Sequence, residues 1–316
     1  MRLVEVADLP DHVWNATTQH LTLPSALGDA YREMIIESGL LDAALAAGND
    51  EDGPVGGVRE EEAKRHFAQR FSSSCARVQI ALVDPKGHLG EASNRLFHAL
   101  AGGRVTLLDI PCGAGAATAT LLLTIAALRR ARVIPSLPLD VFVVGGDFSI
   151  HARNLCERLM SKIDPALRQA QIFVRHKHVE WDVCDPVSTT SLIQNWTSHG
   201  VDCDSYLVVA ANFSGFLEKE RKFDQAKPQL EEIFRWVGLF RSDVIWIEPQ
   251  TNVAKDHFFP RLIRVFTGYL KRLFLPAKVA EQATAKSTCH CPHPLAPTHA
   301  LRVNLTLMRL DRTNPR

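Results

Sequence analysis

The sequence lacks an apolar run long enough to cross a membrane. The apolar stretch Ala117–Leu128 falls short of the roughly 20 residues that a spanning helix needs. The first residues, MRLVEVADLPDHVW, also lack the apolar core of a secretory signal and have acids and a proline there instead. We therefore expect a cytoplasmic protein that does not associate with a membrane.

Cysteine is infrequent and irregularly spaced. The 316 residues include seven cysteines, an odd number without the close spacing of a disulfide-stapled scaffold, which favours a reducing compartment. No internal repeat is present. The apolar fraction of 46% and the charged fraction of 22% are ordinary for a globular chain, which argues against widespread disorder. This length suffices for one large α/β domain with an additional helical segment.

The formal net charge of +1 conceals an uneven distribution. From Arg261 to the end of the chain there are ten Lys and Arg residues but two Asp and Glu residues, so the preceding part is acidic. Clustered basic side chains raise the local concentration of anions. The C-terminal part could therefore bind a polyanion, or it could be an ordinary solvated surface. A basic stripe at helical spacing is formed by Arg261, Arg264, Lys271 and Arg272.

Residues 1–100 are expected to form an N-terminal helical segment. Apolar residues at helical spacing predict a helix over Ala26–Ala47. Acids, glycines and a proline fill residues 48–62, which predicts a mobile loop that could be a plain linker or a lid over a site. Further helices are predicted over Glu61–Val83 and Ala92–Ala101.

From residue 101 onward, apolar β-branched runs alternate with helical patterns. The runs lie at Val105–Ile110, Val141–Val144, Ile172–Val179, Tyr206–Ala211 and Val244–Ile247. Helices are predicted at Ala114–Arg130, Ile150–Ile163, Pro186–Trp196, Pro228–Phe240 and Asp256–Phe274. This alternation is typical of a mostly parallel sheet with helices on both faces, so residues 101–316 are predicted to be one doubly wound α/β domain. The charged, alternating segment Ala300–Leu310 is predicted to be an edge strand.

The first predicted strand ends in a glycine turn that leads into a helix, Asp109-Ile-Pro-Cys-Gly-Ala-Gly-Ala-Ala-Thr118. In doubly wound folds the ligand binds beyond such strand ends. The glycines allow a tight turn and a close approach of a ligand to the helix N-terminus. A dinucleotide site needs a third glycine where this chain has Thr118, and the carboxylate of Asp109 would repel phosphate. That carboxylate suits a ligand that carries an ammonium group and a sulfonium cation.

This turn resembles motif I of the class I S-adenosylmethionine (SAM) dependent methyltransferases, with Pro111 in place of the motif's first glycine. The resemblance extends over roughly residues 100–310. It implies a Rossmann-like sheet of seven strands, with SAM as cofactor and S-adenosylhomocysteine as product. The residues that it implies for cofactor binding are Asp109, Pro111, Cys112, Gly113, Gly115, Asp147, Phe148, Ser149, Asp182, Val183, Asn212 and Phe213.

The resemblance also implies roles at three further strand ends. Asp147 would bind both ribose hydroxyls, since a carboxylate has two acceptor oxygens to match a diol. Asp182 would accept a hydrogen bond from the adenine amino group, and the next backbone N–H, of Val183, would meet the ring. Asn212 and Phe213 would lie close to the transferred methyl group.

The sequence identifies neither a catalytic residue nor a methyl acceptor. Methyl transfer from a sulfonium is an in-line displacement in which positioning can supply much of the catalysis, so a general base is not obligatory. The segment ANFSGFL after the fourth strand has no cysteine for cytosine C5 methylation and no N-P-P-Y for adenine methylation. The conceivable bases are His88, His151, His176 and His178.

Several functions remain open. The acceptor could be a small molecule, or an RNA bound by the basic C-terminal surface. A catalytically silent methyltransferase fold that serves as a partner protein is a third possibility, and a nicotinamide oxidoreductase is a fourth. The sequence does not determine the oligomeric state.

A weaker resemblance concerns the C-terminal third. The segment Val244–Thr251, which contains E-P-Q-T, and the segment Cys289–Leu295 are similar to the E-P-G-T and C-P-H segments of the mitochondrial-type ribosomal small-subunit methyltransferase-like family. Cys289, Cys291 and His293 are residue types that bind zinc or an iron–sulfur cluster. Because C-x-C-x-H lacks a second well-formed pair, we expect a proline-stiffened loop with no metal.

Overall fold

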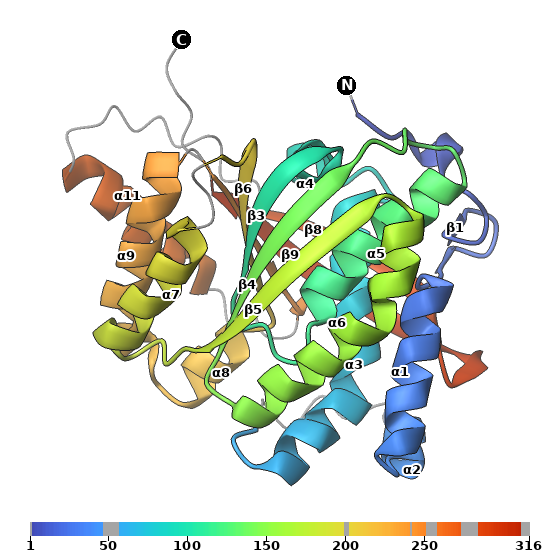
Figure 1. Cartoon of the computed structure of the whole chain (residues 1–316), viewed down its shortest axis with the longest axis horizontal. Helices are drawn as coiled ribbons and strands as arrows, with labels where there is room; N and C mark the ends of the chain where they lie inside the picture. The colour runs from blue at the N-terminus through green and yellow to red at the C-terminus, as the bar shows by residue number, and fades with distance from the viewer. Residues whose placement is uncertain are drawn as a thin grey trace.

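The chain forms one mixed sheet with helices on both faces (Figure 1). The computed structural model describes residues 2–46, 57–198, 202–240, 242–250, 258–272 and 284–310. The α/β class and the mostly parallel sheet are as predicted, but the described ranges contain nine strands rather than seven. Within the same ranges, no helix is both long and apolar enough to cross a membrane.

The centre of the sheet consists of five parallel strands in the order β5-β4-β3-β6-β7. Their bounds are β3 Gly103–Asp109, β4 Leu139–Asp147, β5 Ile172–Glu180, β6 Ser205–Ala211 and β7 Asp243–Glu248. The chain adds β4 and β5 outward on one side of β3, and then β6 and β7 on the other side. The strand order thus reverses between β3 and β6, where open α/β sheets bind their ligands.

The C-terminal strands correct two predictions. β9 (Ala296–Leu310) is not an edge strand, because it lies antiparallel between β7 and β8 (Thr284–His293). β8 replaces the predicted loop, and its buried Cys289 and Cys291 alternate with the exposed His290. Pro292, which cannot donate to the ladder, sits at a register shift, where a missing donor is tolerated.

Two short strands extend the sheet beyond β8. β2 (His20–Leu21) pairs with β8 in parallel, and β1 (Trp14–Asn15) pairs with β2 in antiparallel fashion. The N-terminal segment therefore contributes strands to the same sheet as the C-terminal hairpin. Its apolar side chains also belong to the same core cluster as those of β3, β8 and β9.

The helices form two layers, visible on opposite sides of the sheet in Figure 1. One layer contains α1 (Ser25–Glu37), α2 (Leu41–Leu45), α3 (Glu60–Val83), α4 (Gly90–Leu100), α5 (Ala116–Arg130) and α6 (Ile150–Gln169). The other contains α7 (Pro186–Ser198), α8 (Ser214–Lys219), α9 (Phe223–Phe240) and α11 (Phe258–Arg272). Neighbouring strand residues point to opposite layers, as Leu107 and Leu108 do in β3.

The N-terminal helices differ in detail from the prediction. The single helix predicted over Ala26–Ala47 is two helices, because Gly39 adopts a left-handed φ of 64° and its N–H closes on the carbonyl of Ile36. The predicted loop 48–62 ends early, since α3 begins at Glu60, and residues 47–56 lie outside the described part of the chain. A 3-10 helix at Val6–Asp8 and the short α8 were not predicted.

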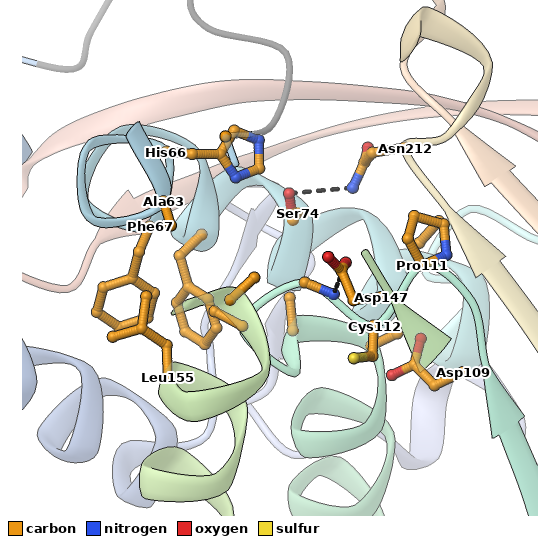
Figure 2. A pocket seen from close by; sticks show the side chains of 18 residues that line it. Ala63, His66, Phe67, Ser74, Asp109, Pro111, Cys112, Asp147, Leu155 and Asn212 are labelled. Carbon is orange, nitrogen blue, oxygen red and sulfur yellow. Dashed lines mark hydrogen bonds between the residues drawn. The ribbon is translucent and has the colours of Figure 1, made fainter. Parts of the chain in front are cut away.

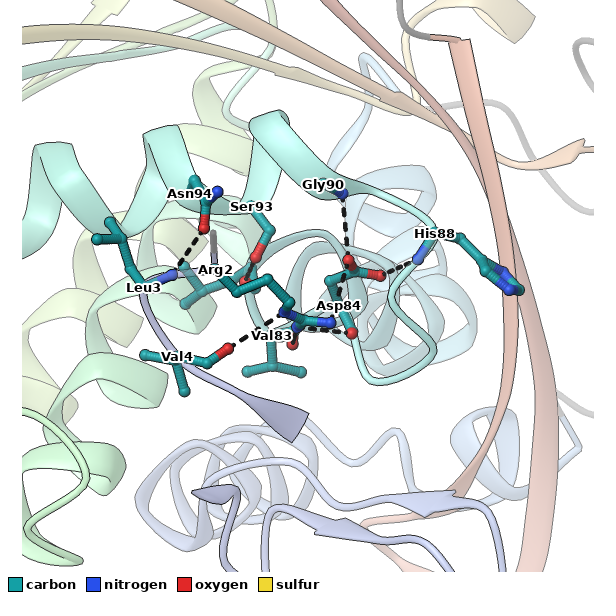
Figure 3. A network of polar contacts seen from close by, with 10 residues as sticks. Arg2, Leu3, Val4, Val83, Asp84, His88, Gly90, Ser93 and Asn94 are labelled. Carbon is teal, nitrogen blue, oxygen red and sulfur yellow. Dashed lines mark hydrogen bonds and ion pairs between the residues drawn. The ribbon is translucent and has the colours of Figure 1, made fainter. Parts of the chain in front are cut away.

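A polar network fastens the start of the chain to the end of α3 (Figure 3). The guanidinium of Arg2 donates to the carbonyls of Val83 and Asp84, at 3.0 and 2.9 Å. The fully buried carboxylate of Asp84 accepts from the backbone N–H groups of His88 and Gly90, at 2.8 and 3.2 Å. This network stabilises the turn between α3 and α4, and it holds α3 where it borders the site described next.

Candidate functional site

A cavity opens beyond the carboxyl ends of β3, β4 and β6, at the reversal of the strand order (Figure 2). The empty space within it, including open solvent at its mouth, is about 760 Å³. Helices α3 and α6 supply the opposite wall. Six of the predicted cofactor residues line the cavity, namely Asp109, Pro111, Cys112, Gly113, Asp147 and Asn212.

The turn after β3 depends on its two glycines. Gly113 and Gly115 have φ angles of 51° and 83°, in the left-handed region that favours glycine. The N–H of Gly115 donates to the carbonyl of Cys112 at 2.8 Å, and Gly115 caps the start of α5. A Cβ atom on Gly115 would lie only 2.7 Å from the sulfur of Cys156. The turn therefore packs closely against α6 and brings the N-terminus of α5 to the cavity.

The carboxylate of Asp109 is buried beside the cavity with one oxygen unsatisfied. Its Oδ2 accepts from the backbone N–H of Thr118 at 3.2 Å and from the Thr118 hydroxyl at 2.7 Å. Its Oδ1 has no hydrogen-bond partner, and the residue is 1% exposed. Burial raises the pKa of Asp109 to about 7, although the hydrogen bonds from Thr118 lower it. A cationic ligand at Oδ1 would satisfy this oxygen and favour the ionised form.

Asp147, at the end of β4, ties the glycine turn to the following helix. Its Oδ2 accepts from the backbone N–H of Gly113 at 2.9 Å, and its Oδ1 accepts from the backbone N–H of Ser149 at 2.9 Å. Burial raises the pKa of Asp147, while these two backbone hydrogen bonds lower it. Each oxygen retains a lone pair, so the carboxylate can still accept from two hydroxyl groups of a ligand.

The remaining predicted residues do not line this cavity. Ser149 caps α6 by accepting from the N–H of Ala152 at 3.3 Å. The side chain of Asp182 accepts from the N–H of Cys184 at 2.9 Å, in the turn after β5. Two of the predicted residues, Val183 and Phe213, are buried in the core on the α7 and α9 side of the sheet. Phe148, by contrast, is 50% exposed next to Asp147.

Helix α3 supplies cavity residues that sequence reasoning missed. His66 and Phe67 on this helix both line the cavity, and Figure 2 shows the Phe67 ring beside Leu155 of α6. Burial lowers the pKa of His66 to about 4, and the nearby positive charge of Arg70 lowers it further, so the imidazole is neutral at physiological pH. The signal available in the sequence is weak, because α3 contains many other polar residues besides the partly exposed His66 and the buried Ser72 and Ser74.

Asn212 joins the end of β6 to α3. It adopts a left-handed φ of 58°, which asparagine tolerates better than most residues. Its Nδ2 donates to the hydroxyl oxygen of Ser74 at 3.0 Å, and its Oδ1 accepts from the guanidinium of Arg77 at 3.4 Å. These contacts fix the Asn212 amide at the cavity wall, as Figure 2 shows for Ser74.

The glutamate of the E-P-Q-T segment is buried and accepts hydrogen bonds from the protein itself. Glu248 is fully buried, and its Oε1 accepts from the N–H groups of Phe213 and Ser214 at 2.9 and 2.7 Å and from the indole of Trp246 at 2.6 Å. Burial raises the pKa of Glu248. Its contacts fix the start of α8 and thereby the position of Asn212.

No protein-family model and no curated protein matches the chain. The chemistry of the site must therefore be inferred from its geometry.

None of the four histidines proposed as bases lines the cavity. His88 lies in the turn between α3 and α4, where its backbone N–H contacts Asp84. His151 lies near the start of α6, and His176 and His178 lie on β5. His66 is the histidine that borders the cavity.

The two other candidate sites are the Cys289–His293 segment of β8 and the basic stripe of α11. Cys289, Cys291 and His293 point to the core from β8, and among the described residues no group of His, Cys, Asp and Glu is arranged to hold a metal ion. In α11, Arg261 is paired with Glu218 and Asp224 at 2.9 and 3.2 Å. The side chains of Lys271 and Arg272 lie outside the described part. One member of the predicted basic stripe is thus already neutralised.

Proposed function

We propose that the chain is a SAM-dependent methyltransferase whose cofactor binds in the cavity at the ends of β3 and β4. The observation that carries this proposal is a pair of carboxylates, Asp109 and Asp147, on either side of a glycine turn at the reversal of the strand order. One of them has a buried oxygen without a partner. This arrangement favours a ligand with both a cationic part and a diol.

The two carboxylates match two different parts of SAM. The unpartnered Oδ1 of Asp109 suits the ammonium group of the methionine part, because a charge-assisted hydrogen bond would satisfy it. Asp147 presents two oxygens, each with a remaining lone pair, to the ribose diol. We further propose that the half-exposed ring of Phe148, which follows Asp147 but does not line the cavity, covers the adenine of the bound cofactor.

The same residues disfavour a nicotinamide dinucleotide. Thr118 occupies the third glycine position with 1% exposure, and its hydroxyl donates to Asp109, so a pyrophosphate would meet a carboxylate there. The sheet also departs from the all-parallel dinucleotide-binding order, because the antiparallel β9 follows β7.

SAM supplies a methyl group that is already activated as part of a sulfonium. The chain's own residues would position the acceptor against it: Asn212 is fixed by Ser74 and Arg77, and His66 is a neutral imidazole that can take a proton from the acceptor. We infer a small-molecule acceptor in preference to RNA, since Arg261 already has two acidic partners. A cytoplasmic location agrees with the seven cysteines, all of which are free thiols.

Calorimetric titration of S-adenosylhomocysteine tests the proposal. We expect binding to the wild type, and we expect Asp147→Ala to weaken it by about tenfold or more, since a hydrogen bond to a charged group contributes about 1.5 to 3 kcal/mol. Asp140→Ala is the matched control, because Asp140 is exposed at the opposite end of the same strand. Equal losses in both variants would refute the ribose assignment.

Two further outcomes decide between the other functions. If the wild type binds neither SAM nor S-adenosylhomocysteine, the remaining hypothesis is a catalytically silent partner protein. If it binds, transfer of a radiolabelled methyl group to fractions of cell extract separates the acceptors. Labelling of the small-molecule fraction supports our inference, whereas labelling confined to RNA, lost steeply with added salt, would favour the RNA methyltransferase.

A further inference from the structure

A second group of reactive side chains lies behind the glycine turn and takes no part in the proposed methyl transfer. Cys112 comes from the turn itself, Cys156 from α6 and His178 from β5. The two cysteines are 5% and 2% exposed, and the side chain of His178 is 4% exposed. Cys112 also lines the cavity, so the group borders the cavity on that side.

The contacts within this group favour one ionised sulfur. Nε2 of His178 lies 3.1 Å from the sulfur of Cys156. The thiol of Cys112 is the hydrogen-bonding partner of the same sulfur. Nδ1 of His178 lies 3.8 Å from a carboxylate oxygen of Glu157. The hydrogen bond from Cys112, together with His178 and against the effect of burial, lowers the pKa of Cys156 below its usual value.

The two cysteines differ in the direction of their pKa shifts. The hydrogen bond with Cys156 raises the pKa of Cys112, and burial and the negative charges of Cys156, Asp147 and Asp109 raise it further. The surroundings therefore favour the thiolate form at Cys156 and the thiol form at Cys112. This is the combination that thiol oxidation requires, since the thiolate is the nucleophile and the neighbouring thiol resolves the product.

Glycines make the space for these side chains. A Cβ atom on Gly115 would come within 2.7 Å of the Cys156 sulfur. A Cβ atom on Gly145 would come within 2.6 Å of the His178 ring and 3.1 Å of the Cys112 sulfur. The backbone of the turn and of β4 is thus closed around the two sulfurs, and any change in their bonding acts directly on the turn.

We propose that Cys112 and Cys156 are a peroxide-responsive thiol pair that closes into a disulfide and thereby disables the turn of the cofactor site. The pairing of the cysteines stands independently, whereas its effect on the cofactor rests on the proposed function. The N–H of Gly113, the next residue after Cys112, donates to Asp147. A disulfide that draws Cys112 toward α6 displaces this N–H and misaligns the carboxylate.

The oxidation proceeds in two balanced steps. The sulfur of Cys156 attacks one oxygen of hydrogen peroxide, so an S–O bond forms, the O–O bond breaks and water leaves after uptake of a proton. The sulfur of Cys112 then attacks the sulfenic sulfur of Cys156, so the S–S bond forms, the S–O bond breaks and its thiol proton leaves in a second water molecule. The two sulfurs together lose two electrons, which the peroxide gains.

Peptide mapping without reduction tests the pairing. We treat the full chain with hydrogen peroxide, block free thiols by alkylation and identify cross-linked peptides by mass spectrometry. We expect a disulfide between Cys112 and Cys156, while Cys184 and Cys203, which are more exposed, remain alkylated thiols. Oxidation of Cys184 or Cys203 before this pair would overturn the proposal.

Two variants test the order of the steps. In Cys112→Ser we expect a sulfenic acid at Cys156 that dimedone traps, because the resolving thiol is gone. In the Cys156→Ser variant we expect Cys112 to stay reduced. In the His178→Gln variant, which retains all the cysteines, we expect the disulfide to form about tenfold more slowly. Near-wild-type thermal unfolding shows that each variant is folded. The assigned roles would be overturned if dimedone labelled Cys112 in the Cys156→Ser variant but did not label Cys156 in the Cys112→Ser variant.

Titration of S-adenosylhomocysteine tests the effect on the site. We expect the oxidised wild type to bind at least about tenfold more weakly than the reduced form, with recovery after dithiothreitol, and Cys112→Ser to show no loss with peroxide. Equal binding by both forms would refute the effect on the cofactor. If the disulfide forms but neither form binds, the proposed function fails and the thiol pair stands.

Discussion

Replacing Asp109 by asparagine should stabilise the unliganded protein and weaken cofactor binding. In the folded chain the pKa of Asp109 is about 7, against an ordinary value of 3.8, because the carboxyl is buried with Oδ1 unpartnered. Between these two values the folded state binds one proton more than the unfolded state. Stability must therefore fall as the pH rises toward 7, by about 1.4 kcal/mol for each pH unit.

The Asp109→Asn variant lacks this pH dependence of stability. Asparagine resembles the protonated carboxyl in shape, and its oxygen can take the place of Oδ2 opposite Thr118. We expect the free energy of unfolding of the variant to exceed that of the wild type by about 1 to 2 kcal/mol at pH 5 and by about 4 kcal/mol near pH 8, so the difference grows by about 2 to 3 kcal/mol between the two pH values. Urea denaturation at both pH values measures this difference, with unchanged m-values as the check on two-state behaviour.

Binding should change in the opposite direction. The amide nitrogen of the variant would occupy the position of Oδ1 and present a donor to the ammonium group of SAM. We expect affinity to fall by about 10 to 100-fold at pH 8, as the loss of a hydrogen bond between charged groups predicts. A stability difference that is the same at pH 5 and pH 8 would refute the assigned ionisation. Unchanged affinity would refute the ammonium contact.

Two further predictions concern the acceptor end of the cavity and its support. His66→Gln should lower the rate of radiolabelled-methyl transfer by about 100-fold, because it removes a base. It should leave the affinity for S-adenosylhomocysteine within about twofold, because the side-chain volume changes little. Equal losses of rate and affinity would make His66 a binding residue. Glu248→Ala should lower the free energy of unfolding by about 3 kcal/mol or more, since it leaves two backbone N–H groups and the Trp246 indole without their acceptor. Glu220→Ala, at an exposed position, is its control and should change stability by less than about 0.5 kcal/mol in urea denaturation.

Local patterns in the sequence sufficed for the central sheet and for one side of the site. Apolar runs of strand length located β3 to β7 within a few residues. Because parallel strands end at the same edge, the acids Asp109 and Asp147 could be placed together before their contacts were known. Their hydrogen bonds to Thr118 and Gly113 follow from the turn between them, which is also local.

The other side of the site depends on contacts between distant segments. Nothing in the sequence near His66 or Ser74 indicates that α3 approaches the residue that follows β6, where Ser74 lies 3.0 Å from Asn212, 138 residues later. The loop predicted at β8 was wrong, because Pro292 in the strand and Pro294 just beyond it indicate a loop, whereas the buried Ser287, Cys289 and Cys291 follow the period of two of a strand. β1 and β2, with two residues each, are too short to show a period.

Gly115 couples the backbone of the site to the thiol pair, and a double-mutant cycle separates the two constraints on it. Gly115→Ala must accommodate a side chain at φ 83° and a contact of 2.7 Å with the Cys156 sulfur. The first constraint costs about 1 to 2 kcal/mol, and the second adds the strain of overpacking, about 1 to 3 kcal/mol. Cys156→Ala removes the sulfur but leaves the backbone conformation unchanged. We therefore expect Gly115→Ala to cost less in the Cys156→Ala background, by about 1 to 3 kcal/mol in urea denaturation, without becoming neutral. Additive losses would mean that the turn moves away from α6 and that the sulfur does not limit it.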